Sequence, residues 1–498
     1  MSPAALRRLS PRRGPSTDPL DASAVELARW IRERRVSSEE VVGAHMARID
    51  RVDPKLRAVV HRRFEEARRE AKEADQRVAR GEELGPLHGV PCTIKDFFAV
   101  RGVPQTGGLV ARSRAVANED AVLVSRLRRA GAIVLGTTNV PEGGLWMETH
   151  NALFGRTNNP WDLGRTPGGS SGGEGAIVAA GGSPFGLGSD IGGSVRIPAA
   201  FCGVAGHKPT GRMLPNTGQF PATKGELSAY LCAGPLARRI EDLMPLLRVM
   251  AGPDAGDSAS RAFELGDPSV VRPEELVVYP IEAPGRIGVR ASVRRGVRDA
   301  TGALVAAGAR VGEAKLPRLA KAFEIWAAML SEVAELSYDQ ILTDGQERDR
   351  VPVLAELFKI ALGRSAHTFP AIAVAGLERV LKRFEGPRAT LVAEGRALGA
   401  ELEALLGDRG VLVYPVYSRP APRHMDALRT PFDAACTAIF NVLELPSTVV
   451  PVGFEARGLP IAVQIVGARG RDHLTIAAAS LVEAELGGWE RATPAGVS

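Results

Sequence analysis

Apolar and polar residues follow two different spacings along this chain. Short, mostly apolar runs of the kind that form buried strands occur at residues 132–136, 411–415, 447–454 and 461–467. The longer stretches between them are amphipathic, as helices are. Two helices are expected to begin at capping boxes, Ser23 with Glu26 and Ser37 with Glu40. Strands that alternate with helices predict an α/β fold, in which helices cover a β-sheet.

Residues 164–210 differ from the rest of the chain because they are crowded with glycine and serine. Glycine is conformationally costly, and it is retained where the backbone turns tightly or comes close to another group. Ser170 and Ser194 both lie among glycines, so their hydroxyls are expected beside exposed backbone N–H groups. That is the arrangement of a nucleophile next to an oxyanion hole.

Other glycine-rich motifs fit this segment less well. The chain lacks the Gly-Lys-Ser/Thr run of a phosphate-binding loop, and Ile191 stands where a dinucleotide fingerprint needs its third glycine. Ser170 does fit the G-x-S-x-G nucleophile elbow of α/β-hydrolases. The elbow requires a strand that runs into the serine, whereas residues 158–169 contain prolines and an Asn pair and predict a loop. A purely structural glycine-rich turn, followed by a helix near residues 176–180, is the remaining alternative.

The candidate base is a lysine, because none of the eight histidines is placed like the base of a Ser-His-Asp triad. His45 and His61 lie in charged segments that predict solvated helices. Lys95 lies in an apolar, strand-like segment at residues 90–100. If Lys95 is buried there, desolvation lowers its pKa towards the range of a general base. The alternative is a surface lysine at a strand end, paired with Asp96.

The surroundings of Lys95, Ser170 and Ser194 resemble a known family of enzymes. GGSSGG at residues 168–173 and GLGSDIGGSVRIPAAFCGVAGHKPT at residues 186–210 are similar to the signature of the amidase signature family. Residues 26–60 and 440–483 resemble the family's opening helices and its closing strands and helix. SSGGEGA and residues 206–221 and 232–252 look like its fatty-acid amide hydrolase branch, especially the second type. They look less like the A subunit of glutamyl-tRNA amidotransferase.

The resemblance implies a Ser-cisSer-Lys triad of Lys95, Ser170 and Ser194, with a cis peptide bond between Gly169 and Ser170. Neutral Lys95 would deprotonate Ser170, Ser170 would deprotonate Ser194, and Ser194 would attack an amide carbonyl to form an acyl-enzyme. The implied oxyanion hole consists of the backbone N–H groups of Ile191, Gly192, Gly193 and Ser194. Further polar positions of the motif are expected to hold the relay in place: Ser171, Ser189, Asp190 and Arg196. No metal or organic cofactor is implied.

The resemblance also specifies the domain organisation. It implies one large domain, residues 21–498, with a central mixed β-sheet covered by helices on both faces. The signature core spans about residues 80–252, and the divergent region, about residues 253–430, is expected to shape the substrate site. Residues 1–20 form a basic tail that supplies about half of the formal net charge of +6, and we expect this tail to be disordered. A transit peptide is the alternative for the tail.

Charge and cysteine usage narrow the choice of partners and compartment. Outside the tail the net charge is small, so the pI of about 9.3 does not predict nucleic-acid binding. No stretch reaches the roughly 20 apolar residues that span a bilayer. The four cysteines are scattered without pair spacing and predict free buried thiols in a reducing cytoplasm: Cys92, Cys202, Cys232 and Cys436.

The expected substrate is a small-molecule amide, with a lipophilic or fatty-acyl amide favoured by the branch resemblance. Apolar stretches within residues 353–384 predict either core helices or a hydrophobic cap that touches a membrane surface. Two other functions stay open. One is an amidotransferase A-type subunit that acts in glutaminyl- or asparaginyl-tRNA formation, and the other is a serine esterase. Assembly as a homodimer also stays open.

Overall fold

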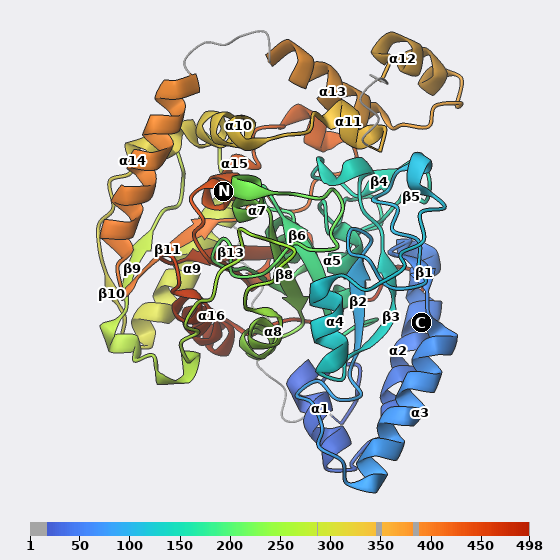
Figure 1. Cartoon of the computed structure of the whole chain (residues 1–498). Helices are drawn as coiled ribbons and strands as arrows, with labels where there is room; N and C mark the ends of the chain where they lie inside the picture. The colour runs from blue at the N-terminus through green and yellow to red at the C-terminus, as the bar shows by residue number, and fades with distance from the viewer. Residues whose placement is uncertain (1–16, 286, 345–350, 382–387, 498) are drawn as a thin grey trace.

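The molecule is built on one large β-sheet (Figure 1). This computed structural model describes residues 17–285, 287–344, 351–381 and 388–497. The strands among these residues lie side by side in the order β1 (Val59–Arg62), β3 (Ile133–Thr138), β2 (Pro91–Lys95), β6 (Phe185–Asp190), β8 (Cys232–Ala237), β7 (Ala205–Lys208), β12 (Ser447–Phe454), β13 (Pro460–Val466), β11 (Gly410–Pro415), β9 (Val277–Pro280) and β10 (Arg310–Val311). β2 runs parallel to β3 and β6, whereas β12 and β13 are antiparallel. The predicted α/β fold with a central mixed sheet is therefore confirmed.

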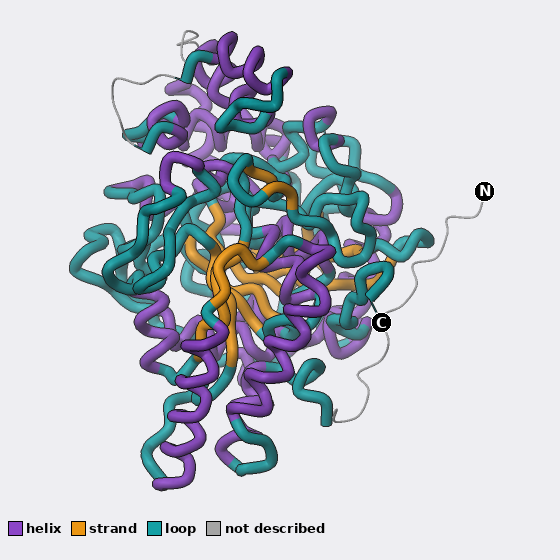
Figure 2. Tube along the Cα trace, turned by 90° about the vertical axis from the view of Figure 1, so that its right-hand side faces the viewer, coloured by secondary structure: helices purple, strands orange, loops and turns teal. Residues whose placement is uncertain are grey.

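Both faces of the sheet are apolar, and helices cover each of them. Side chains along a strand alternate between the faces, so Val134 of β3 joins one core while Ile133 and Leu135 join the other. The first core lies against α1 (Ala24–Arg32), α4 (Val122–Arg129), α8 (Leu243–Met250), α9 (Ala291–Ala306) and α16 (Asp472–Leu486). The second lies against α2 (Ser38–Leu56), α3 (Phe64–Arg80), α5 (Gly172–Ala179) and α6 (Arg196–Cys202). Figure 2 shows the strands enclosed among the helices.

A third group of helices extends the second face towards β11. Four helices pack together there around Leu412 and Tyr414: α7 (Gly225–Tyr230), α10 (Ala322–Val333), α14 (Arg388–Leu406) and α15 (Ala435–Val442). Val411 and Val413, which alternate with them, belong to the first core. The divergent region thus adds β9, β10 and β11 to one edge of the sheet and packs α10 against α15 of the closing segment.

The local predictions hold at the helix starts and in the strands. Ser23 and Ser37 cap α1 and α2, and Glu26 and Glu40 complete both capping boxes. The four apolar runs predicted as strands form β3, β11, β12 and β13. The helix predicted after the signature glycines is α5. A separate two-stranded sheet pairs β4 (His150–Asn151) with β5 (Gly155–Arg156).

Three helices form a small layer of their own, which we call the cap: α11 (Tyr338–Leu342), α12 (Val353–Ala361) and α13 (Phe369–Leu381). The cap lies at one end of the molecule (Figure 1). Its own apolar cluster packs onto Leu109, Leu145 and Phe220 of the signature core. The apolar stretch singled out in the sequence, 353–384, forms α12 and α13, and its residues 382–384 lie outside the described residues.

The N-terminal tail, the cysteines and the helix lengths can also be compared with the predictions. Of the tail predicted to be disordered, residues 1–16 lie outside the described residues. Within residues 17–20, the Asp18 carboxylate accepts a hydrogen bond from Arg491 (3.0 Å). All four cysteines are free and buried, as predicted. None of the helices in the described part of the chain combines the length and the apolar composition that a bilayer crossing requires.

Candidate active site

The three triad candidates come from three elements that meet at one edge of the second core. Lys95 is the last residue of β2, Ser170 lies just before α5, and Ser194 lies just before α6. Lys95 Nζ donates a hydrogen bond to Ser170 Oγ (2.7 Å). The Gly169–Ser170 peptide bond is cis, as the family resemblance implies. Loop and turn residues, without a named strand, lead into Ser170, so the nucleophile-elbow interpretation fails.

Lys95 is completely buried in a setting that favours its neutral form. Its Nζ also donates to Ser189 Oγ (3.0 Å) and lies 4.4 Å from the ring centroid of Phe97. Burial lowers the pKa of Lys95 to about 7, although the carboxylates of Asp190 and Glu174 act in the opposite direction. The alternative of a surface lysine is therefore wrong.

The residue after Lys95 has partners of its own. Asp96 is buried, and its carboxylate accepts hydrogen bonds from the Thr106 hydroxyl and, at 3.1 Å, from the Thr106 N–H. Burial raises the pKa of Asp96 to about 7. Asp96 therefore fixes the loop after β2, and the predicted surface pair between Lys95 and Asp96 does not describe this site.

Glu174 is an acidic residue of the site that sequence reasoning overlooked. It lies in the first turn of α5, fully buried, and accepts hydrogen bonds from Thr93 Oγ1 (2.6 Å) and Thr138 Oγ1 (2.8 Å). Thr93 lies on the same face of β2 as Lys95, and Thr138 is the β3 residue paired with Lys95. Burial raises the pKa of Glu174 to about 8, so desolvation favours the uncharged form of both groups. An acidic residue in a helix that otherwise contains only glycine and apolar residues was the available signal.

Ser194 reaches the same cavity but does not yet bond to Ser170. Among the hydrogen bonds of the described residues, none joins the hydroxyls of Ser170 and Ser194. The two loops are tied through Ser171, whose N–H donates to Ser194 O (3.1 Å). Ser171 Oγ in turn donates to Ser189 O (3.3 Å) and accepts from Ser189 N (3.4 Å). The structure therefore joins Lys95 to Ser170 directly and Ser170 to Ser194 through the backbone.

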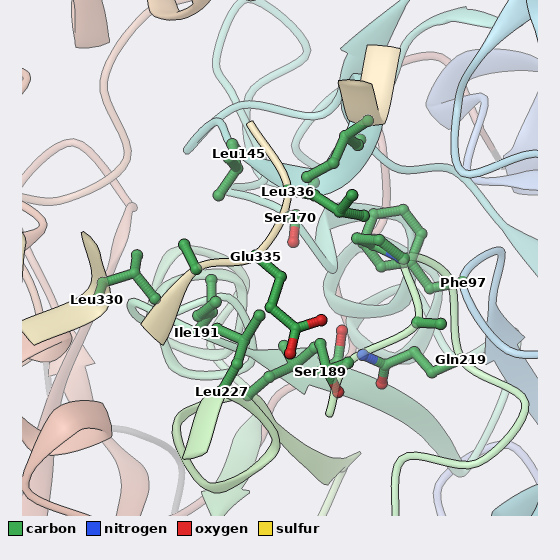
Figure 3. A pocket seen from close by; sticks show the side chains of 18 of the residues that line it. Phe97, Leu145, Ser170, Ser189, Ile191, Gln219, Leu227, Leu330, Glu335 and Leu336 are labelled. Atoms are coloured by element: carbon green, nitrogen blue, oxygen red, sulfur yellow. The ribbon is translucent and has the colours of Figure 1, made fainter. Parts of the chain in front are cut away.

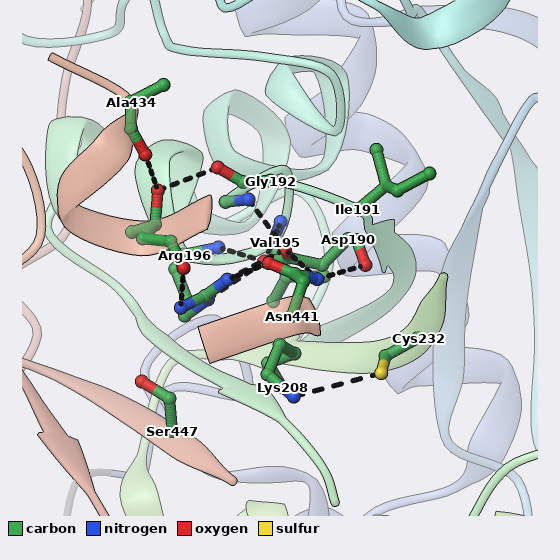
Figure 4. Close-up of polar contacts among 12 residues, drawn as sticks. Asp190, Ile191, Gly192, Val195, Arg196, Lys208, Cys232, Ala434, Asn441 and Ser447 are labelled. Carbon is green, nitrogen blue, oxygen red and sulfur yellow. Dashed lines mark hydrogen bonds and ion pairs between the residues drawn. The ribbon is translucent and has the colours of Figure 1, made fainter. Parts of the chain in front are cut away.

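A buried ion pair supports the turn that precedes Ser194 (Figure 4). Arg196 donates to the Asp190 carboxylate through Nη2 (2.9 Å) and Nε (3.0 Å), and both side chains are fully buried. Burial alone would raise the pKa of Asp190, but the Arg196 guanidinium holds it well below its usual value. The carboxylate also accepts hydrogen bonds from the N–H groups of Gly193 (2.6 Å) and Val195 (3.0 Å).

The predicted oxyanion hole needs one correction, at Gly193. Its N–H is bonded to Asp190 and so is not available to a substrate oxygen. Only glycine fits there, because φ is 124° and a Cβ would lie 2.2 Å from the Thr437 hydroxyl. The N–H groups of Ile191, Gly192 and Ser194 have no acceptor among the described residues.

The cavity next to these groups is mainly apolar and encloses about 800 Å³, including the part open to solvent. Figure 3 shows Ser170 among apolar side chains such as Leu145 and Phe97, with the polar side chains of Ser189, Gln219 and Glu335 also in the lining. The lining includes Phe97, Leu145, Ile191, Leu227, Leu231, Leu330, Leu336 and Ile341. Gln219, another overlooked residue, also lines the cavity, and its buried side-chain amide has no partner in the described structure. Leu330, Leu336 and Ile341 come from the divergent region.

Histidines and metal ligands play no visible part in this cluster. No histidine is among the described residues that line the cavity. The prediction that His45 and His61 lie on solvated helices is wrong. His45 is buried on α2 with Nε2 2.9 Å from Arg238 Nη2, and His61 lies in β1. In the described ranges, no group of His, Cys, Asp or Glu side chains is arranged to hold a metal ion.

Comparison with known proteins identifies the family of this chain. The family model described as Amidase matches residues 40–476. Fatty-acid amide hydrolase 2-A of Danio rerio is 40% identical, over 95% of this chain and 91% of that protein. Acylamidase of Rhodococcus erythropolis is 34% identical, over 93% of this chain and 95% of that protein.

The fold is shared with solved enzymes as well. The structure of 6-aminohexanoate cyclic dimer hydrolase complexed with substrate superposes with a TM-score of 0.77 at 29% identity. The match covers 94% of this chain and 97% of that one. The chain therefore belongs to the amidase signature family and is an amide hydrolase, closely related to fatty-acid amide hydrolase 2.

Proposed function

We propose that this protein hydrolyses lipophilic acyl amides, with Ser194 as nucleophile and with Ser170 and Lys95 as a proton relay. The observation that carries the proposal is the buried Lys95 Nζ bonded to Ser170 Oγ (2.7 Å) beside an apolar cavity that Ser194 also lines. A lysine with a pKa of about 7 has a substantial neutral fraction at physiological pH, and the neutral amine can accept a proton.

The relay works in both halves of the reaction. Neutral Lys95 takes the proton of Ser170, and Ser170 takes the proton of Ser194 as Ser194 Oγ bonds to the amide carbon. The carbonyl π electrons move to oxygen, and the tetrahedral intermediate forms. Ser170 then returns a proton to the leaving nitrogen, which would otherwise leave as a poor amide anion. Water hydrolyses the acyl-enzyme by the same relay and regenerates Ser194.

The second proton transfer requires a contact that closes when substrate binds. Catalytic hydrogen bonds are often long in the free enzyme and tighten in the complex. We assign the developing oxyanion to the N–H groups of Ile191, Gly192 and Ser194, which are left without acceptors. Asp190, Arg196, Ser171 and Ser189 have supporting roles, because they hold the turn and Lys95 in place.

Labelling with a fluorophosphonate tests the nucleophile. Ser194→Ala should lose labelling and nearly all turnover, while the control Ser258→Ala, at an exposed serine, should behave as wild type. If Ser194→Ala retained labelling and Ser170→Ala lost it, Ser170 would be the nucleophile. Hydrolysis of esters without hydrolysis of the matched amides would favour the serine esterase. Stable co-purification with amidotransferase B- and C-type subunits would favour the A-type subunit.

The apolar lining supports a long, lipophilic acyl group as the substrate class. Each buried methylene should contribute about 0.8 kcal/mol, or about fourfold in kcat/KM. From acetamide to decanamide, kcat/KM should therefore rise through medium chains and then level off. Leu336→Asp, in the lining, should flatten the series, and the exposed control Val270→Asp should not. A flat series in the wild type would indicate a small or aromatic amide instead.

The cap supports a second part of the proposal, peripheral contact with a membrane. Leu354 and Phe358 of α12 and its C-cap residue Leu362 follow one another at four-residue spacing and are exposed, Leu354 to 84% and Phe358 to 67%. A lipid surface would cover these side chains and deliver lipophilic substrate. The four free thiols support a cytoplasmic location.

A further inference from the structure

The backbone turn before Ser194 is held by its carbonyl groups. In a trans peptide unit, the C=O of one residue and the N–H of the next point in opposite directions. A donor that holds the carbonyl therefore also fixes the direction of the following N–H. Four donors hold the successive carbonyls of this turn: Asn441 Nδ2 on Asp190 O (2.7 Å), Trp326 Nε1 on Ile191 O (3.0 Å), Thr437 Oγ1 on Gly192 O (2.7 Å) and Ile197 N on Gly193 O (2.6 Å).

Trp326 differs from the other donors in its origin. Asn441 and Thr437 belong to α15 of the closing segment, whereas Trp326 belongs to α10 of the divergent region. Its indole also packs against the turn, because a Cβ on Gly192 would lie 3.4 Å from Cζ2 of the ring. Leu330, one turn later on the same helix, lines the cavity. α10 therefore joins the cavity wall to the backbone that precedes the nucleophile.

We propose that Trp326 is a positioning residue for the oxyanion hole. Its indole N–H keeps the peptide between Ile191 and Gly192 in the orientation that leaves the Gly192 N–H free for the substrate oxygen. Without this donor, the Ile191 carbonyl loses its partner, and the peptide is free to rotate. Rotation turns the Gly192 N–H away and withdraws one donor from the anion. The inference rests on the proposed function, because it requires Ser194 to attack a carbonyl.

Trp326→Phe tests the inference, since it removes the N–H and keeps an aromatic ring. The matched control is Phe323→Leu, which removes a ring from the same helix, 5.6 Å from that of Trp326, and retains the indole donor. Trp326→Phe should lower kcat about 10- to 100-fold and leave KM within about twofold. Phe323→Leu should stay within about threefold of wild type in both constants.

Binding of inhibitors separates positioning from general damage. A long-chain alkyl boronic acid, which forms a tetrahedral adduct with serine, should bind Trp326→Phe more weakly by the factor lost in kcat/KM. The matching fatty acid, which forms no adduct, should bind as tightly as to wild type. Replacement of Trp326 by 3-benzothienylalanine keeps the shape of the ring and substitutes sulfur for N–H, so it serves if Trp326→Phe does not fold.

Two results would overturn the inference, and neither is the failure of the proposed function. One is a wild-type kcat and boronic-acid affinity when the indole N–H is removed. The other is an equal loss in Trp326→Phe and Phe323→Leu, which would assign the effect to packing of α10. In both cases Ser194→Ala would still be inactive. Full amide turnover by Ser194→Ala would instead refute the proposed function.

Discussion

The candidate catalytic cluster and the cap depart from ordinary burial in opposite directions. The cluster buries four ionisable side chains completely: Lys95, Glu174, Asp190 and Arg196. The cap exposes a row of large apolar side chains on α12 and its C-cap residue: Leu354, Phe358 and Leu362. Charged groups are seldom buried without partners, and contiguous exposed apolar groups mark surfaces that contact something else.

The buried ionisable cluster and the exposed apolar row are stabilised in different ways. Every buried ionisable group in the cluster has hydrogen-bond partners inside the protein, and these partly compensate its desolvation. The same desolvation lowers the pKa of Lys95, as the proposed proton relay requires. The apolar row on α12 has no comparable compensation in water, which is why we assign a lipid surface to it.

The largest expected effect comes from Lys95→Ala, which removes the proposed base. kcat for amides should fall about 10²- to 10⁴-fold, the usual contribution of general acid–base catalysis. The decrease should be smaller for matched esters, because an alkoxide leaves more easily than an amide anion. Steady-state kinetics on an amide and an ester with the same acyl chain measures both. A wild-type rate in this variant would exclude the relay.

Asp190→Asn should have the next largest effect, on stability. The free energy of unfolding should fall by about 3–5 kcal/mol, because the Arg196 guanidinium is left buried without its counter-charge. Glu65→Gln is the matched control, since it breaks an exposed pair with Arg68 and should change stability by less than about 1 kcal/mol. Urea unfolding followed by tryptophan fluorescence compares the two. Similar small losses would show that the buried pair matters no more than a surface pair.

The pH dependence should report the neutral form of Lys95. Its pKa is lowered to about 7, and only the neutral amine accepts a proton, so kcat/KM should fall about tenfold per pH unit below pH 7 and level off above it. Asp96 and Glu174, with pKa values raised to about 7 and about 8, titrate nearby. The control is therefore Lys95→Ala, in which the fall of kcat/KM below pH 7 should disappear. A fall that persists in this variant would report the titration of Asp96 or Glu174.

The smallest effect on the fold is expected in the cap. The double substitution Leu354→Ser and Phe358→Ser should change the free energy of unfolding by less than about 0.5 kcal/mol, because both side chains are already exposed. Binding to phosphatidylcholine vesicles should weaken at least tenfold, since burial of each side chain in lipid contributes about 1.5–3 kcal/mol. Co-sedimentation measures it, with Val270→Ser as an exposed control. Unchanged sedimentation would remove the membrane from the proposal.

The parts of the site that could be predicted are those with a local signal. Ser170 and Ser194 stand out because they lie among glycines, and Lys95 because its neighbours are apolar. The contact of Trp326 with Ile191 could not be predicted, because no pattern in the segment around Trp326 indicates a bond to a turn more than a hundred residues earlier. The burial of His45 could not be predicted for the same reason. Its helix is charged, but His45 itself is buried and contacts Arg238 from another segment.

By itself, the sequence determined the α/β fold class, the helix caps and the family, and it indicated the candidate triad. These features depend on residue type and on short-range spacing, and both can be recognised without any knowledge of tertiary contacts. Only the tertiary structure decided that Lys95 is desolvated, that Gly193 donates to Asp190, and that one face of α12 remains exposed. Desolvation and hydrogen-bond pairing arise when distant segments exclude water together, so no local pattern encodes them.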